Sequence, residues 1–472
     1  MTVPLKSRFA PSPTGLIHFG NVRTALFNAL LSRKEKGIFL LRIEDTDAAR
    51  SRESFTQALQ EDLKWLGLDW QEGEGIGGQF GPYRQSDRAG IYESHLRTLE
   101  EKERIYPCFC SSVELEVSRK VQAASGIPPR YSGKCAHLKA DEIEAKKAQG
   151  LPHTLRFRMP RKESLDFEDL VRGKQHFSTD EIGDFIIRRS DGSFAFFYVN
   201  ALDDALMQVT HVFRGEDHLT NTPRQIAILN ALDLPIPQYG HISLIVDGNG
   251  APLSKRSGSL AVQELKEMGY FPLAVNNYLA RLGHNYQDNS LMDLDALSAA
   301  FSVENLGKAP ARYDRSQLDY WQSQALQKAD PPLLSSWLRE SVSKWVPEKE
   351  IDAFASAIRD NILFPHDAEI WAEAIYAEKL PVSIEAMSIL EETPAEFFRQ
   401  ASGCLSHDLD FKSFSQKVKE KTGAQGKKLF LPLRVALTGQ THGPEMPRIL
   451  PLIGFERARH RLAQHVLNED IC

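Results

Sequence analysis

The fold of the first part of the chain is decided by the stretch Arg8-Phe9-Ala10-Pro11-Ser12-Pro13-Thr14-Gly15-Leu16-Ile17-His18-Phe19-Gly20-Asn21. Its two prolines fix φ and disfavour helix, so a first strand must stop where they begin. Its two glycines lack a Cβ atom and let a ligand approach the backbone closely. Apolar residues then recur at helical spacing from about Asn21, and free N–H groups at a helix N-terminus attract phosphate. The stretch therefore predicts a strand, a rigid turn with a phosphate site, and a helix; the alternative is a proline-rich turn with a surface histidine.

The bulk composition is that of an ordinary soluble globular protein. The chain has 472 residues, of which 42% are hydrophobic and 25% are charged, and its length predicts about three domains. It has no apolar run of about 18 residues and no signal-peptide core, so we expect no membrane partner. Five cysteines in so long a chain favour a reducing, cytoplasmic setting. With a net charge of −6, a nucleic-acid partner would need local basic patches.

A second strand signal is followed at once by acidic residues. Residues 38–43 are apolar enough to predict a buried strand, and the run Glu44-Asp45-Thr46-Asp47 follows its carboxyl end. Ligands of doubly wound sheets bind at this edge, where acids can hold a substrate ammonium group. Helix capping is the alternative, because a helical pattern comes next. We expect Glu44 to be a ligand and Asp47 to be a cap.

The middle of the chain alternates between strand and helix signals. Residues 80–190, with strand-like stretches inside, predict an insertion that splits the sheet. The sheet is expected to resume with strands at 196–200 and 209–218, and to continue with a strand at 241–246. Arg214 would then lie at the ligand-binding edge; the alternative is that it only pairs with Glu216 or Asp217 and serves the structure. The whole pattern is typical of an α/β domain.

One glycine-rich segment is a false match. Gly73-Glu74-Gly75-Ile76-Gly77-Gly78 fits the pattern G-x-G-x-x-G, but residues 79–82 continue as a loop and open no helix. We therefore exclude a dinucleotide fingerprint here, and the chain contains no P-loop pattern.

Two pairs of metal-ligating residue types lie twenty-four residues apart, Cys108 with Cys110 and Cys135 with His137. Two cysteines two positions apart can face one metal ion, and the second pair would complete a tetrahedral Cys₃His set. Four protein ligands leave no open position, so the predicted zinc is structural. The alternative is two buried thiols beside an unrelated thiol and histidine.

After residue 260 the strand signals fade and helical stripes continue to the end of the chain. The last part carries local basic runs, which either solvate helix faces or form an RNA-binding surface. These basic residues are Lys417, Lys419, Lys421, Lys427, Lys428, Arg434, Arg448, Arg457, Arg459 and Arg461.

A second short motif changes the interpretation. The run Leu253-Ser254-Lys255-Arg256-Ser257-Gly258, together with the 8–21 stretch, resembles the two signatures of class I aminoacyl-tRNA synthetases. The sequence around both motifs is similar to that of bacterial glutamyl-tRNA synthetases, and the resemblance covers essentially the whole chain. It implies a doubly wound Rossmann-like catalytic domain with an inserted α+β zinc-containing acceptor-binding domain, followed by an all-α anticodon-binding region. The expected segments are 1–80 and 191–258 (catalytic), 81–190 (inserted), 259–325 (helical linker) and 326–472 (anticodon-binding).

The resemblance also implies a two-step reaction with L-glutamate, ATP accompanied by Mg²⁺, and tRNA(Glu) as partners of a monomer. Glutamyl-adenylate forms first with release of pyrophosphate, and the tRNA ribose hydroxyl then takes the glutamyl group. The expected roles are assigned by family correspondence. They are catalysis for His18 and Lys255; ATP binding for Thr14, His18, Gly20, Lys255 and Arg256; glutamate carboxylate binding for Arg8 and Arg214; and binding of its polar ends for Ser12, Glu44 and Asn200, with Phe196 beside them.

Three residues depart from the family pattern. Phe196 stands where the family commonly has Tyr, Asn21 replaces the last His of the first motif, and Pro252 replaces the usual Lys of the second. There are four alternative functions. An enzyme that also charges tRNA(Gln) fits equally well. A glutaminyl-tRNA synthetase usually has a β-barrel anticodon domain, and the helical pattern of this chain argues against it. The truncated relative that modifies a tRNA base lacks the C-terminal region, which this chain has. A non-catalytic RNA-binding zinc protein would leave His18 and Lys255 unexplained.

Overall fold

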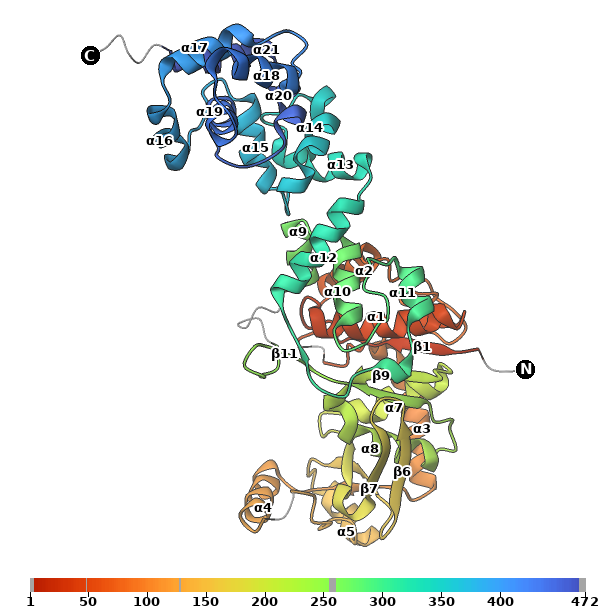
Figure 1. Cartoon of the computed structure of the whole chain (residues 1–472). Helices are drawn as coiled ribbons and strands as arrows, with labels where there is room; N and C mark the ends of the chain where they lie inside the picture. Colours follow the sequence, from red (N-terminus) through yellow and green to blue (C-terminus); the bar gives the residue numbers. More distant parts are fainter. Residues whose placement is uncertain (1–3, 48, 127–128, 254–259, 467–472) are drawn as a thin grey trace. The chain divides into compact units, whose positions relative to one another are not determined.

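The computed structural model describes residues 4–47, 49–126, 129–253 and 260–466. The chain divides into two compact units. The first consists of Met1–Glu264 and Val275–Leu318, and the second of Leu265–Ala274 and Asp319–Cys472. The predicted catalytic and inserted segments thus share one unit. Figure 1 labels many of the helices and some of the strands of both units.

A seven-stranded sheet forms the centre of the first unit, with the order β3-β2-β1-β9-β10-β6-β7. Neighbouring strands are parallel except for the antiparallel β6–β7 hairpin. The carboxyl ends of β1, β2, β9 and β10 therefore meet at one edge, which confirms the predicted α/β class. The strands are β1 Lys6–Phe9, β2 Ile38–Leu41, β3 Glu72–Gly73, β6 Ser164–Asp169, β7 Gly173–Ser178, β9 His211–Gly215 and β10 Gln238–Ile242.

The helices of the first unit pack against this sheet and around its edges. Leu40 from the sheet and Ile226 from a helix share one apolar core cluster. These helices are α1 Phe19–Lys34, α2 Glu53–Trp65, α3 Ala89–Glu101, α7 Phe196–Leu206, α8 Thr222–Ala231 and α11 Leu294–Ala300, while α9 Val262–Met268 and α10 Pro272–Arg281 each cross a boundary of the two units.

Two local predictions about these elements are wrong. Residues 196–200, expected as a strand, are the first turns of α7. A short apolar run does not distinguish a strand from a buried helix, and here Tyr198, Val199 and Leu202 face a core cluster at helical spacing. Asp47 does not cap α2, whose N-cap is Arg52; it pairs with Arg50 instead.

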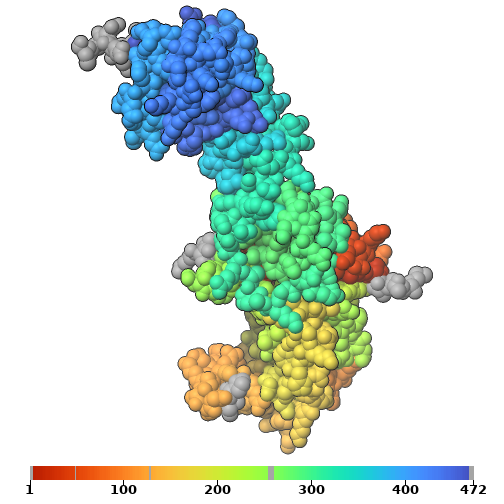
Figure 2. Space-filling view, in the orientation of Figure 1, coloured from red at the N-terminus to blue at the C-terminus, as the bar shows by residue number. Residues whose placement is uncertain are grey.

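The insertion contributes a separate three-stranded antiparallel sheet of β4 Ile105–Cys108, β5 Thr154–Phe157 and β8 Phe185–Arg188. Around it lie α4 Ser112–Ala124, α5 Ala140–Ala148 and the short α6 Thr179–Ile182. Helix α4 has no buried residue, and it stands out from the body of the first unit in Figure 2. The β6–β7 hairpin, although within the predicted insertion, extends the main sheet beside β10.

The strand predicted over 241–246 is divided between two sheets. Its first part belongs to β10, whereas β11 Ile245–Val246 pairs in parallel with β12 Ala311–Arg312. Just after β11, Pro252 forms an isolated bridge with Val246. The departure at Pro252 therefore lies in a paired backbone segment.

The described part of the second unit contains helices and no strand, as predicted. Among the predicted basic residues, Arg461 is buried (1% exposed) and donates hydrogen bonds to four backbone carbonyls, so it serves the fold. The remaining helices are α12 Arg315–Lys328, which begins in the first unit, α13 Pro331–Val342, α14 Ile351–Ile358, α15 Asp367–Tyr376, α16 Ile384–Glu392, α17 Ala395–Cys404, α18 Phe411–Thr422, α19 Lys427–Thr438, α20 Met446–Ile453 and α21 Phe455–Gln464. None of the helices in the described ranges is both long and apolar enough to cross a membrane.

Candidate active site

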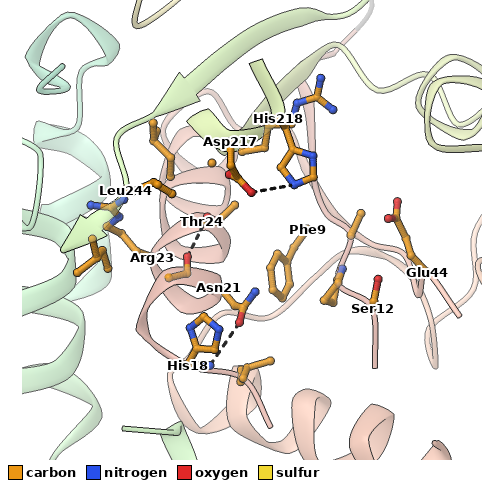
Figure 3. A pocket seen from close by; sticks show the side chains of 18 of the residues that line it. Phe9, Ser12, His18, Asn21, Arg23, Thr24, Glu44, Asp217, His218 and Leu244 are labelled. Carbon is orange, nitrogen blue, oxygen red and sulfur yellow. Dashed lines mark hydrogen bonds and ion pairs between the residues drawn. The ribbon is translucent and has the colours of Figure 1, made fainter. Parts of the chain in front are cut away.

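A cavity of about 610 Å³ opens at the carboxyl edge of the parallel strands, beside the N-terminus of α1. Figure 3 shows side chains pointing toward it from the 9–24 segment, from the end of β2 and from the segment after β9. The structure brings every described candidate residue for substrate binding into its lining. These are Arg8, Ser12, Thr14, His18, Gly20, Glu44, Phe196, Asn200 and Arg214.

The turn between β1 and α1 forms one wall. His18 is the N-cap residue of α1, so the helix begins two residues before the predicted Asn21. Asn21 Oδ1 accepts a hydrogen bond of 3.5 Å from the backbone N–H of His18 (Figure 3). The unusual last residue of this motif thus contributes to the helix cap. A Cβ atom on Gly15 would meet nothing within 4 Å, so the wall is open to a ligand there.

Lys255 and Arg256 lie outside the described residues. The residues on either side of their segment are held at the cavity: Leu253 N–H donates to Ile245 O (2.9 Å), and Val262 N–H donates to Ile17 O (3.1 Å). Ile245 and Ile17 both line the cavity. Both ends of the segment that carries the second motif are therefore attached to this site.

Arg8, Arg42 and Asp204 form a buried ionic cluster below the cavity. Asp204 Oδ1 lies 3.2 Å from Arg8 Nε and 2.7 Å from Arg42 Nη1. Burial raises the pKa of Asp204, but the two guanidinium groups outweigh it and hold that pKa below its usual value. Arg42 also donates to Glu44 Oε1 (3.0 Å), whose other donor is Asn200 Nδ2 (2.6 Å). Burial raises the pKa of Glu44, and Arg42 opposes that effect.

Arg214 is held by neutral partners. Its Nε donates to His241 Nε2 (3.1 Å), and its Nη2 donates to Thr222 Oγ1 (2.7 Å) and Gln225 Oε1 (2.6 Å). Its Nη1 is buried and has no hydrogen-bond partner among the described residues. Burial lowers the pKa of Arg214 to about 10, which leaves it a cation at neutral pH.

The alternative role for Arg214, pairing with Glu216 or Asp217, is wrong. Glu216 pairs with Arg172, and Asp217 lies 3.7 Å from His218 Nε2. Among the described residues no carboxylate lies within ion-pair distance of Arg214. A ligand carboxylate would therefore find a buried cation with a free donor.

Phe196, which stands where the family commonly has Tyr, lies against His218. Their ring centroids are 5.3 Å apart. Burial, with help from the nearby charge of Arg214, lowers the pKa of His218 to about 4, so this imidazole is neutral at pH 7. Where the family commonly has a tyrosine hydroxyl, this wall therefore presents the Phe196 ring beside a neutral imidazole.

Sequence reasoning missed the residues that support these side chains. Thr222 and Gln225 lie on α8, and His241 lies on β10; all three are buried. Two polar residues three apart, in register with the apolar face of this helix, were a usable signal, because buried polar groups need partners. The partner of His241 is distant in sequence and gave no such signal.

A second candidate site lies in the insertion. The sulfur atoms of Cys108, Cys110 and Cys135 all lie within 4.8 Å of one another. His137 is not part of this group. The hydroxyl of Tyr131 lies 3.3 Å from Cys108 Sγ and 3.5 Å from Cys110 Sγ, and it accepts a hydrogen bond from the backbone N–H of Cys135. Three convergent thiols fit a zinc ion, and Tyr131 offers an oxygen beside them.

Three features together define a nucleotide-binding α/β enzyme domain. They are the parallel sheet, the turn before α1 whose helix N-terminus suits a phosphate, and the ionic cavity at the carboxyl edge of the strands. Comparison with known families identifies which one: the chain belongs to the class I tRNA synthetases. The family described as "tRNA synthetases class I (E and Q), catalytic domain" matches residues 4–320, and the family described as "Anticodon binding domain" matches residues 333–466.

Individual relatives extend over nearly the whole chain. Glutamate--tRNA ligase 2 of Nitrosococcus oceani is 54% identical over 459 residues, which are 97% of each chain. Glutamate--tRNA ligase 2 of Alkalilimnicola ehrlichii is 52% identical and covers 98% of this chain and 97% of its own. The crystal structure of a glutamate tRNA ligase from Elizabethkingia meningosepticum, in complex with its amino acid, is 26% identical. It has a TM-score of 0.90 and covers 98% of this chain and 99% of its own.

Proposed function

We propose that the protein attaches L-glutamate to tRNA(Glu) through glutamyl-adenylate, consuming ATP and releasing AMP and pyrophosphate. The observation that carries the proposal is Arg214, a buried cation in the cavity wall whose Nη1 has no partner among the described residues. Relatives about half identical over the full chain are named glutamate--tRNA ligases, which supports the same substrate.

The charges of the cavity favour glutamate over glutamine. Arg8 shares Asp204 with Arg42, whereas Arg214 has only neutral partners. A substrate carboxylate supplies the missing anion and can accept charge-assisted hydrogen bonds from Nη1 of Arg214. A glutamine amide brings no charge and would leave the buried cation unpaired, which costs several kcal/mol. In this proposal Arg8 binds the other carboxylate, and Ser12, Glu44 and Asn200 bind the polar ends.

The turn before α1 is the proposed phosphate site. The first turn of α1 contains no acidic residue, so its N–H groups and dipole favour an anion. Thr14, His18 and Gly20 would hold ATP there, and Lys255 and Arg256 would approach the phosphates from the segment tethered at Ile245 and Ile17. Mg²⁺ would be held mainly by the phosphates. The glutamate α-carboxylate then attacks the α-phosphorus, and catalysis consists of positioning and charge stabilisation.

The remaining parts of the chain, the insertion and the helical second unit, would bind tRNA. The insertion would hold one structural zinc ion through Cys108, Cys110 and Cys135. There are two candidates for the fourth ligand: His137, which the sequence motif predicts, and Tyr131, whose hydroxyl lies beside the thiols. Such a metal would cross-link the insertion and take no part in the reaction. The insertion would bind the acceptor end, and the helical second unit would bind the anticodon. The five predicted segments, the monomeric state and a cytoplasmic location complete the proposal.

Charging assays test the function directly. Purified protein is incubated with ATP, purified tRNA(Glu) or tRNA(Gln), and radiolabelled glutamate or glutamine. We expect glutamyl-tRNA(Glu) to form and glutamine to be left unused. Transfer of glutamate to tRNA(Gln) as well would identify a broader tRNA range, and absence of charging with every pair would overturn the proposal.

A further inference from the structure

His241, which lies behind the cavity wall, connects Arg214 to a carboxylate of the β6–β7 hairpin. The imidazole is fully buried, and its Nδ1 lies 2.5 Å from Asp169 Oδ2. Its Nε2 lies 3.1 Å from Arg214 Nε and 3.0 Å from Thr222 Oγ1. Neither Asp169 nor His241 lines the cavity. They can affect a substrate only through Arg214.

The surroundings of Asp169 fix its ionised state. Its Oδ1 accepts backbone N–H bonds from Val171 (2.9 Å), Arg172 (2.7 Å) and His241 (3.2 Å). Burial opposes ionisation, but these bonds and His241 keep the pKa of Asp169 below its usual value. Because an ionised carboxylate only accepts hydrogen bonds, His241 Nδ1 must carry a proton.

The tautomer of His241 follows from this requirement. A neutral imidazole with a proton on Nδ1 has an unprotonated Nε2, which is an acceptor. Arg214 Nε–H is a donor that cannot give up its proton, so an acceptor is what it needs. Burial lowers the pKa of His241, which keeps the ring neutral. The direction of every hydrogen bond from Asp169 to Arg214 is thereby determined.

Two further bonds complete the support of Arg214. Thr222 and Gln225, three residues apart on α8, accept from its Nη2. With Nε and Nη2 occupied, the planar guanidinium cannot rotate, and Nη1 is the nitrogen left without a partner among the described residues. The orientation of that nitrogen depends on the acceptor offered by His241.

We infer that Asp169 and His241 are positioning residues for glutamate, which set the tautomer that holds Arg214 with its Nη1 directed at the substrate carboxylate. The inference rests on the proposed function. It also gives the β6–β7 hairpin a role, because Asp169 is the last residue of β6 and reaches His241 only since β6 pairs with β10.

The first experiment observes the tautomer in the unaltered protein. The chain is labelled with ¹⁵N-histidine, and the ring nitrogens of His241 are identified by loss of their signals in His241→Gln. We expect a protonated Nδ1 and an unprotonated Nε2. A proton on Nε2, or a doubly protonated ring, would overturn the inference, and this result does not depend on catalytic activity.

The second experiment separates positioning from folding. His241→Phe keeps an aromatic ring but removes the acceptor, and Asp169→Asn removes the reason for a proton on Nδ1. Each should raise the KM for glutamate at least about ten-fold in aminoacylation, with the KM for ATP changed less than about two-fold. His241→Gln, whose amide can both donate and accept, should restore most of the glutamate affinity.

The control is His284→Phe, which alters another buried histidine of the first unit that does not line the cavity. It should leave both KM values unchanged. Equal changes of the two KM values in His241→Phe and Asp169→Asn, or no rescue by His241→Gln, would show that the pair only stabilises the fold. If the tautomer is as expected but the same effects on KM are found with an amino acid other than glutamate, the proposed function is overturned and the positioning role stands.

Discussion

Asn200 Oδ1 accepts a hydrogen bond of 2.7 Å from Gln225 Nε2, and this bond joins the two halves of the proposed glutamate site. On one side, Asn200 Nδ2 donates to Glu44; on the other, Gln225 Oε1 accepts from Arg214. Each amide therefore has one orientation that satisfies both of its neighbours. The acidic and the cationic ends of the cavity are coupled through two neutral side chains.

This coupling predicts the effect of a charge at Gln225. In Gln225→Glu, a carboxylate would face Arg214 and supply the anion that the substrate otherwise provides. It would also lose the donor to Asn200. We expect the KM for glutamate to rise more than about ten-fold, since a buried charge pair would have to be broken for binding. Aminoacylation kinetics with separate glutamate and ATP titrations measure this.

The matched control is Gln225→Met, which loses the same hydrogen bonds and adds no charge. Its glutamate KM should rise less than that of Gln225→Glu. If the two variants are equally impaired, the loss comes from the broken bonds, and the proposed electrostatic competition is refuted.

Arg214→Gln removes the buried cation itself. The substrate carboxylate would then lose a charge-assisted contact, which costs about 2–5 kcal/mol, most of it from leaving a buried anion unpaired. Glutamate use should fall accordingly, while ATP binding changes little. Glutamate-dependent pyrophosphate exchange with tRNA present gives the two KM values. Equal losses for both substrates with a lowered melting temperature would assign Arg214 to the fold.

Lys255 is a prediction from the sequence motif alone, because it lies outside the described residues. Lys255→Ala should abolish adenylate formation, since the charge that develops on the phosphates would lose its cation. Its circular dichroism spectrum and melting temperature should match those of the unaltered chain. Normal pyrophosphate exchange in this variant would remove Lys255 from the mechanism.

The sequence predicted local elements and missed long-range partners, for physical reasons that particular residues illustrate. Prolines and glycines act on their own backbone, so the turn before α1 was predicted nearly to its end. The helix at Phe196 was missed because its apolar run suits a buried strand equally well. Asp169 and His241 are 72 residues apart, and only the pairing of β6 with β10 brings them together. The thiols were found by their spacing, whereas Tyr131, which lies among them, is not part of a spaced cysteine–histidine motif.

Zinc should be present at one ion per chain by elemental analysis. Cys108→Ser should lose it and destabilise mainly the insertion, because structural zinc contributes directly to folding. Cys404→Ser, which alters a buried cysteine of the second unit, should retain it. Tyr131→Phe and His137→Ala then identify the fourth ligand. The substitution that removes it should make the protein lose zinc more readily to a chelator. A protein without zinc but with full tRNA affinity would refute the site.

Acid should destabilise the first unit through His284. Burial lowers the pKa of His284 to about 4, with Lys34 and Arg281 adding to the effect. Between this value and the unfolded pKa of about 6.5, the unfolded chain binds more protons than the folded one. Stability from the neutral imidazole is therefore complete above pH 6.5 and is lost as the pH falls toward 4, by about 2 kcal/mol at pH 5.

His284→Phe keeps an aromatic ring that can stack on Phe301 but cannot titrate. Urea unfolding of both proteins at pH 7 and pH 5 isolates the contribution of His284 from that of the other buried histidines. The variant should lose less stability than the unaltered chain over this interval, and parallel losses would show that His284 is not the group that takes up the proton.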